Sequence, residues 1–315
     1  MKRHFREWSI AAALGLVLLG LALVAPSFYE RQPLLSLLAS ESPSLVVACG
    51  MALVILARQI DISVGSQFAV CSVCAGLLAA THWPLGLVLL ASVAIGVVMG
   101  ALNGFLVAGL GLPSIVVTLA TMVSWRKALE WQRQGQFVNL PDGTQWFGLT
   151  QVQGQLALVA AALGLVILLS MAMSCLAAGR FVYAVGSDAE AARLAGLRPR
   201  LVTFGVFVLI GALTGAAALM NMVQSPQVDP KSGTGLELKV IAAVVVGGVA
   251  ITGGRGNLWG VFVGVLLLAC ISPALVHLHV EAYWERAIQG GIILLAVVAD
   301  GLRGRKQTNE SIGFG

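Results

Sequence analysis

The sequence predicts an all-α, polytopic membrane protein with about ten transmembrane helices, some of them broken or re-entrant. Hydrophobic residues make up 58% of the 315-residue chain and charged residues only 10%, and the mean hydropathy is +0.92. A soluble domain is typically about half apolar and about one quarter charged. Because successive apolar runs leave no room for a soluble catalytic domain, we expect residues 1–315 to form a single transmembrane domain.

Ten apolar runs are predicted to cross the membrane, with charges or turn residues between them. In chain order they are residues 8–25, 43–57, 64–80, 84–106, 113–125, 155–177, 201–222, 238–251, 258–276 and 287–299.

The basic residues predict the orientation of these spans. An even number of crossings places both termini on the same side. If that side is the cytoplasm, 12 of the 19 Lys and Arg residues fall on inner segments and 7 on outer ones. The positive-inside rule therefore predicts cytoplasmic N- and C-termini, a cytoplasmic loop over residues 179–200 and an outer loop over residues 126–154.

The stretch RQIDISVGS, residues 58–66, places an acid between two apolar runs. The run before it, residues 43–57, would span only ~22 Å as a helix, whereas a bilayer core is about 30 Å thick. Asp61 and Ser63 are good N-caps for the run that follows. We expect a broken helix in which Asp61 lines or braces a pathway. The alternative is a tight cytoplasmic turn, and the same two possibilities stay open for AITGGRGN, residues 250–257.

Polar residues near or inside the spans are the candidates for lining that pathway, because ionisable and polar groups at membrane depth are usually functional. The candidates are Asp61, Ser63, Ser66, Asn103, Thr118 and Thr121. For the two threonines, which share one helical face, hydrogen bonding between helices is the favoured alternative.

The charged loop GRFVYAVGSDAEAARLAGLRPR, residues 179–200, predicts a short capped helix. Ser187 and Glu190 have the spacing of a capping box, and Gly196 is a typical helix stop. The expected helix covers residues 187–197, with Ala191 and Leu194 on one small apolar face. Such a helix fits a groove on a partner; the alternative is a solvated surface turn.

Several motifs resemble the permease subunits of bacterial ABC sugar importers, in the ribose, xylose, rhamnose and autoinducer-2 group. The strings concerned are IDISVGS at residues 60–66, GSDAEAARLAGL at 186–197 and the long glycine-rich string at 233–264. Two positions depart from the usual motif, since Asp188 stands where Asn is common and Ala195 where Ser is common. The region 126–154 matches no motif of the group, and the tail 281–301 looks most like the rhamnose and autoinducer-2 branch.

The resemblance implies a multi-pass protein of the bacterial inner (plasma) membrane that passes a simple sugar from a periplasmic binding protein to the cytoplasm. A separate ABC ATPase subunit would bind ATP and Mg, so no cofactor is expected in this chain. A second permease chain, identical or paralogous, would complete the pathway within the lipid bilayer. The resemblance assigns ATPase docking to a coupling helix with Gly186, Ser187, Asp188, Glu190, Ala191, Ala192, Arg193, Leu194 and Gly196.

Other functions are less well supported by the sequence. An ion-coupled secondary transporter generally needs buried acids or histidines as relays, and Asp61 is the only acid expected at depth. No H-E-x-x-H or G-x-x-x-x-G-K-[ST] motif occurs, and no basic–aromatic patch suggests nucleic acid. Cys71 and Cys74 form a C-x-x-C pair without a second ligand pair nearby, so we expect no metal site. We also expect no catalytic residues, and hence no enzyme.

Overall fold

The computed structural model describes residues 5–24 and 26–277, together with six isolated helical positions between 284 and 294. Most of the expected span 287–299, the tail 281–301 and both chain ends lie outside these residues. The elements, in order, are α1 Phe5–Val24, η1 Pro26–Tyr29, α2 Arg31–Leu56, α3 Val64–Ala80, α4 Leu85–Gly104, the π-helical η2 Phe105–Gly109, α5 Ser114–Arg133, β1 Val138–Asn139, η3 Gln145–Gly148, α6 Gln151–Cys175, α7 Ala177–Ser187, α8 Ala189–Leu194, α9 Pro199–Met222, β2 Gln227–Val228, α10 Leu236–Val246, α11 Leu258–Ala269 and α12 Ile271–His277.

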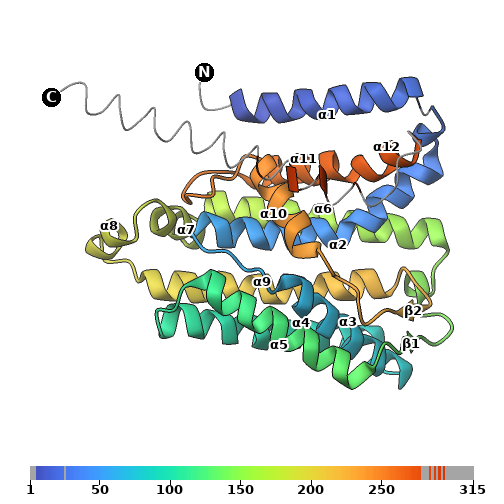
Figure 1. The fold of residues 1–315 in the computed structure, drawn as a ribbon, viewed down its shortest axis with the longest axis horizontal. Helices are drawn as coiled ribbons and strands as arrows, with labels where there is room; N and C mark the ends of the chain where they lie inside the picture. The colour runs from blue at the N-terminus through green and yellow to red at the C-terminus, as the bar shows by residue number, and fades with distance from the viewer. Residues whose placement is uncertain are drawn as a thin grey trace.

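The helices lie side by side in one bundle, as Figure 1 shows. One end of the bundle, here called the α8 end, carries α8, the first residues of α1 and the connections α2–α3, η2–α5 and α10–α11. The connections on either side of α7 and α8 lie at this end too, whereas the opposite end carries β1 and β2 and the connections α1–α2, α3–α4 and α5–α6. The described segments that the charge pattern assigns to one side of the membrane therefore lie at one end of the bundle.

Five of the described helices are long and apolar enough to cross a membrane. They are Arg31–Leu56, Leu85–Gly109, Gln151–Cys175, Pro199–Met222 and Leu258–Val276. Shorter apolar helices, among them Val64–Ala80, lie between them. The described residues thus agree with the predicted all-α membrane class, whereas the number of crossings stays a prediction.

The predicted span 43–57 is wrong at its beginning. Helix α2 starts at Arg31 and runs for 26 residues, with Pro43 inside it. Proline removes one backbone donor and crowds the preceding turn, but membrane helices tolerate it where nearby groups compensate. Here Pro43 is buried, and α2 continues through it from Arg31 to Leu56. The chain before Asp61 is therefore long enough to span, and the short-span argument for a break does not hold.

Helices α4 and α9 cross with their backbones in direct contact. Ser92, Gly96 and Gly100 recur every four residues on α4, and Gly211 and Gly215 do so on α9. A Cβ on Gly211 would collide with the carbonyl oxygen of Gly96, and one on Gly96 with that of Gly211. Small residues at this spacing let membrane helices approach closely, and Ser92 adds a hydrogen bond of 2.7 Å to the Gly215 carbonyl.

The predicted outer loop 126–154 is shorter than expected. Helix α5 continues to Arg133 and ends at Gln134, which is left-handed with φ 48°. Beyond it, β1 pairs antiparallel with β2, with Val138 opposite Val228. This segment also binds the chain just after α9, because the Trp146 amide donates to the Val223 carbonyl at 2.7 Å. The loop is therefore folded against the α9–α10 connection.

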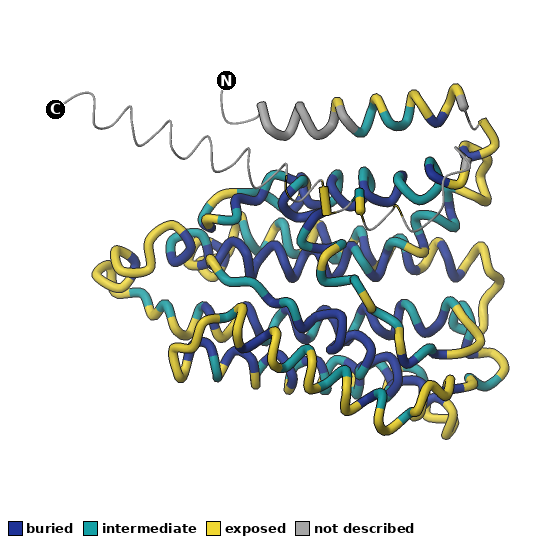
Figure 2. The backbone as a smooth tube through the Cα atoms, viewed as in Figure 1, coloured by how far each residue is buried: buried dark blue, intermediate teal, exposed yellow. Residues whose placement is uncertain are grey.

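Burial is highest along the middle of the bundle, where α2, α3 and α9 meet, as Figure 2 shows in dark blue. Outward-facing apolar side chains such as Val98 on α4 and Leu168 on α6 are 68% and 66% exposed. In a membrane protein such residues suit contact with lipid chains, so the exposure of these helices is consistent with the predicted environment.

The α4–α9 contact yields a prediction about stability. Gly211→Val forces a branched side chain against the Gly96 carbonyl, and overpacking of this kind costs about 1–3 kcal/mol. We expect a lower midpoint of thermal unfolding in detergent. Gly205→Val on the same helix is the control, since a Cβ there meets nothing within 4 Å. Equal unfolding midpoints for the two variants would contradict the close contact.

Candidate functional site

The connection between α2 and α3 turns back into the bundle. Helix α2 ends in a Schellman motif, in which the Arg58 amide donates to Ile55 at 2.9 Å and the Gln59 amide to Val54 at 3.0 Å. Arg58 holds the left-handed position with φ 63°, which glycine usually occupies. In Figure 1, the connection leaves the α8 end and α3 begins part-way along the bundle. The predicted break therefore exists, although α2 is not short.

Asp61 is fully buried at this break and accepts hydrogen bonds from its neighbours. Its carboxylate accepts from the Ser63 amide at 2.8 Å and the Ser63 hydroxyl at 2.5 Å. It also accepts from the Gln67 side-chain amide at 3.1 Å. Its partners thus come from the start of α3, Ser63 and Gln67. A solvated turn at Asp61 is excluded by its burial.

Two side-chain amides contact the Ser63 hydroxyl beside Asp61. The side-chain amide of Asn103 on α4 donates to the Ser63 hydroxyl at 2.8 Å, and Gln67 donates to the same oxygen at 2.7 Å. The Ser66 hydroxyl turns instead to the Ser63 carbonyl at 2.7 Å. Asp61, Ser63, Ser66 and Asn103, predicted separately, thus lie together. Gln67 was missed because a glutamine inside an apolar run has no distinctive spacing.

The two threonines on α5 behave differently from that cluster. Thr118 is buried and donates to the Ser114 carbonyl at 2.9 Å, with the Ile60 carbonyl of the break 3.5 Å away. The Thr121 hydroxyl donates to Val117 within its own helix at 3.1 Å. Thr118 therefore borders the break, whereas Thr121 has no bond to the cluster. Both threonines form hydrogen bonds within their own helix.

A second helix begins inside the bundle, but not where the sequence suggested. The glycine-rich segment 250–257 is a turn at the α8 end, whereas α10 starts centrally, as Figure 1 shows. Arg126 of α5 joins the starts of both inner helices. Its guanidinium donates to the Gly65 carbonyl on α3 at 2.9 Å and to the Ser232 carbonyl before α10 at 3.1 Å. The role of Arg126 was missed because it was assigned to the outer loop.

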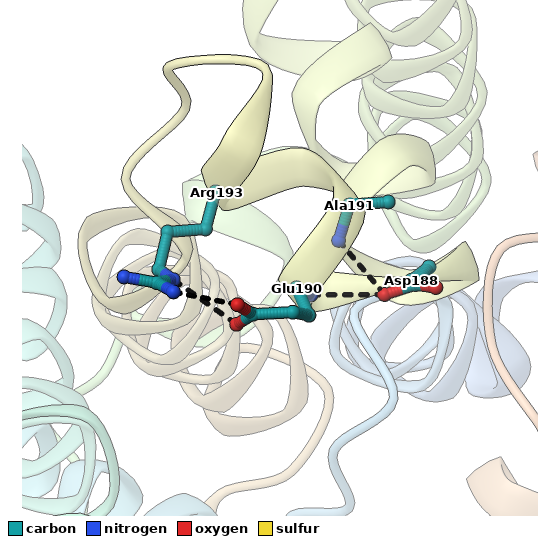
Figure 3. Close-up of polar contacts among 4 residues, drawn as sticks. All are labelled: Asp188, Glu190, Ala191 and Arg193. Carbon is teal, nitrogen blue, oxygen red and sulfur yellow. Dashed lines mark hydrogen bonds and ion pairs between the residues drawn. The ribbon is translucent and has the colours of Figure 1, made fainter.

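The loop over residues 179–200, here called the coupling loop after the resemblance noted from the sequence, folds as two helices rather than one. The expected N-cap Ser187 is the last residue of α7, and its hydroxyl donates to the Tyr183 carbonyl at 2.9 Å. The N-cap is Asp188, whose carboxylate accepts from the amides of Glu190 and Ala191 at 2.9 and 3.0 Å, as Figure 3 shows. The predicted capping box is wrong because Ser187 completes the preceding helix and Asp188 offers an equally suitable cap.

The remaining features of α8 follow the prediction. Gly196 has φ +87° and ends the helix in a Schellman motif, with its amide bonded to Arg193 and that of Leu197 to Ala192. Glu190 and Arg193 form a two-point ion pair at 2.5 and 3.0 Å (Figure 3). This hydrogen bonding raises the pKa of Arg193.

Helix α8 exposes an apolar face beside its Glu190–Arg193 ion pair. Ala191 and Ala195 are exposed, Leu194 is 78% exposed, and Ala192 is buried against the bundle. Figure 1 shows α8 protruding at one end of the molecule. A rigid helix that presents Leu194 in this way is suited to insertion into a groove of another protein.

Residues 34–297 match the family described as "Branched-chain amino acid transport system / permease component". The chain belongs to this permease family. It is 34% identical over 304 residues to the "Autoinducer 2 import system permease protein LsrC" of Enterobacter sp. (strain 638), covering 96% of this chain and 89% of that protein. It is 35% identical over 303 residues to the protein of that name from Escherichia coli (strain K12 / DH10B), covering 93% and 86%. No solved structure matches the chain significantly.

The comparisons confirm the resemblance noted from the motifs, which included the autoinducer-2 group. The matched family region contains the break at Asp61, Arg126, the coupling loop and the start of α10. The permease therefore carries both inner helix starts and α8 within the region that defines its family.

The Asp61 cluster yields a prediction about folding. Asp61→Leu leaves the Ser63 amide and the Ser63 hydroxyl proton without their acceptor in the interior, and each such group costs about 1–3 kcal/mol. The Gln67 amide loses one of its two bonds and keeps the one to the Ser63 hydroxyl. We expect a large loss of folded permease and a lower unfolding midpoint in detergent. Asp61→Asn should be milder, because Gln67 can rotate and offer its unpartnered Oε1 to the new amide.

Asp142→Leu is the control for that experiment, since Asp142 is exposed in the folded loop at the other end. If Asp61→Leu unfolded at the same temperature as Asp142→Leu, the Asp61 cluster would not hold the break.

Proposed function

We propose that this permease passes autoinducer-2 or a related simple sugar, of the rhamnose or ribose and xylose type, from a periplasmic binding protein across the inner membrane. The names of the relatives support the substrate class. The capped α8 with its exposed apolar face carries the proposal of a driven importer, because a free-standing transporter has no need of such a helix.

A separate ATPase subunit supplies the energy in this proposal. It holds ATP and Mg²⁺, for which this sequence offers no glycine-rich phosphate loop of the usual type. Its groove receives α8, with Ala191 and Leu194 as the inserted apolar residues and Asp188 and Gly196 as the caps that keep the helix rigid. ATP-driven closure of the ATPase pair then moves α8 and shifts the permease between outward- and inward-facing states.

A second permease chain, identical or paralogous, completes the pathway in this proposal. Helix α5 supports this idea, because it lies at the edge of the bundle in Figure 1 and is exposed at Val116, Val123 and Lys127. A lysine is costly against lipid chains, so contact with protein or water suits that face better. Asp61, Ser63 and Asn103 act as braces for α3 rather than as sugar ligands, since all three are fully buried.

Reconstitution tests the proposed function directly. Vesicles that contain the permease, its ATPase and the binding protein should take up labelled autoinducer-2 when ATP is supplied, and labelled ribose or rhamnose serves as the competing substrate. Ala191→Trp should abolish ATP-driven uptake while the chain still inserts, because the indole would prevent α8 from seating in its groove.

The control is Gln136→Trp, which places the same large side chain on an exposed loop residue. Normal uptake by an inserted Ala191→Trp variant would contradict docking through α8. Uptake driven by an ion gradient without ATP would instead favour the secondary transporter.

The proposal also requires the α8 end to face the cytoplasm. The 12 to 7 division of basic residues supports this orientation. We expect a single cysteine at Gln136, in a cysteine-free background, to react with a membrane-impermeant maleimide in intact cells. A cysteine at Ala189 should react only after the membrane is opened. Both positions are exposed, so labelling of Ala189→Cys in intact cells would overturn the orientation.

A further inference from the structure

Three backbone segments meet beside the coupling helix. They are the end of α2 at Leu56, the end of α7 at Gly186 and the turn 253–256 after α10. The Gly254 amide donates to the Leu56 carbonyl at 2.9 Å. The Tyr183 hydroxyl of α7 donates to the Gly256 carbonyl, also at 2.9 Å. Two hydrogen bonds thus tie the turn to the ends of α2 and α7.

The meeting point has no space for side chains. A Cβ on Gly186 would collide with the Leu56 carbonyl oxygen and would lie 2.9 Å from the Gly254 nitrogen. A Cβ on Gly253 would lie 2.7 Å from the Gly186 oxygen. Contacts below 3.0 Å against backbone cannot be relieved by rotating a side chain. The three segments therefore touch backbone to backbone, and we call this site the glycine junction.

Each of the three segments leads to an element that a driven importer has to move. Gly186 lies two residues before Asp188, the cap of α8. Leu56 leads into the break at Asp61, from which α3 starts. The turn 253–256 follows the C-terminal end of α10, and the 11 residues of this helix separate the turn from the start of α10 by about 16 Å. Its first residues lie beside Gly65 of α3, because a Cβ on Gly65 would collide with the Glu237 carboxylate.

We propose that Gly186, together with Tyr183, is a positioning residue that links α8 to both inner helix starts through the glycine junction. This inference rests on the proposed function, since it assigns a route to movement delivered by the ATPase. When α8 moves, the end of α7 carries Leu56 and the turn 253–256 with it. The rigid α10 then transfers the displacement to the segment that Arg126 holds against α3.

The test measures whether a nucleotide signal reaches the far end of α10. Thr234, exposed just before α10, is replaced by cysteine in a cysteine-free background as the reporter. The permease–ATPase complex is compared without nucleotide and after trapping with ATP and vanadate. The rate of reaction with a maleimide at Thr234→Cys should change on trapping, and this readout does not require the sugar to be known.

Gly186→Ala should reduce that change at least about fivefold, the lower range of typical coupling between sites. Co-purification of the ATPase is measured alongside, because the resemblance counts Gly186 in the coupling helix although it is buried at the end of α7; if Gly186→Ala loses the ATPase, Tyr183→Phe alone decides the outcome. Tyr183→Phe, which removes the hydrogen bond to the Gly256 carbonyl without adding a clash, should cause a smaller reduction. Gly205→Ala is the matched control, because it lies near the same end of the bundle and its new Cβ meets nothing within 4 Å.

Responses of Gly186→Ala and Tyr183→Phe equal to that of Gly205→Ala would overturn the glycine junction as the route. If Gly186→Ala does not accumulate, Tyr183→Phe alone decides the outcome in the same way. Failure of the ATPase to co-purify with the Gly205→Ala chain would instead count against the proposed function. The two failures are therefore distinguishable.

Discussion

The pairing of backbone polar groups at helix ends inside a membrane is the constraint on which this fold depends. In a bilayer core, water cannot satisfy the free amides of a helix start or the carbonyls beside it. The permease nevertheless starts α3 and α10 within its bundle. Asp61 accepts from the Ser63 amide, and Arg126 donates to the carbonyls of Gly65 and Ser232. One acid and one arginine thus pair backbone groups beside both interior helix starts.

These hydrogen bonds differ in kind from the contacts that hold the rest of the bundle. Helices α4 and α9 touch through glycines, and the same is true of the glycine junction. Glycine contacts allow little sliding, because a shift of one backbone moves its neighbour. A cluster of side-chain hydrogen bonds can exchange partners with small movements of its members. The contacts are therefore tightest where helices cross, whereas the starts of α3 and α10 are held by side-chain hydrogen bonds.

The sequence could predict elements whose signals are local. The bounds of α3 agree with the predicted run 64–80, because a capping acid and a helix stop lie within a few residues of its ends. The short helix α8 and its stop at Gly196 were predicted on the same basis. Local signals were ambiguous where two neighbours could serve the same purpose. Ser187 and Asp188 both fit an N-cap, and only the continuation of α7 through Ser187 decides between them.

Contacts between segments far apart in the chain could not be predicted from local sequence patterns. Pro43 was taken as a helix start because its tolerance inside α2 depends on the buried surroundings of that helix. The β1–β2 pair joins residues 138 and 228, and neither strand has more than two residues to give a pattern. Arg126 was assigned to a loop because its partners lie on α3 and before α10.

Helix α8 is kept in shape by local interactions rather than by burial in the core of the permease. Leu194 is 78% exposed among the described residues, although α8 is capped at both ends and braced by the Glu190–Arg193 pair. An exposed ion pair contributes little to global stability, so the Glu190–Arg193 pair and the caps serve chiefly to keep a short helix in one shape. A helix of six residues is too short to persist by propensity. Its order is therefore maintained locally while its apolar face stays available, and the glycine junction directly behind it connects that face to the interior helix starts.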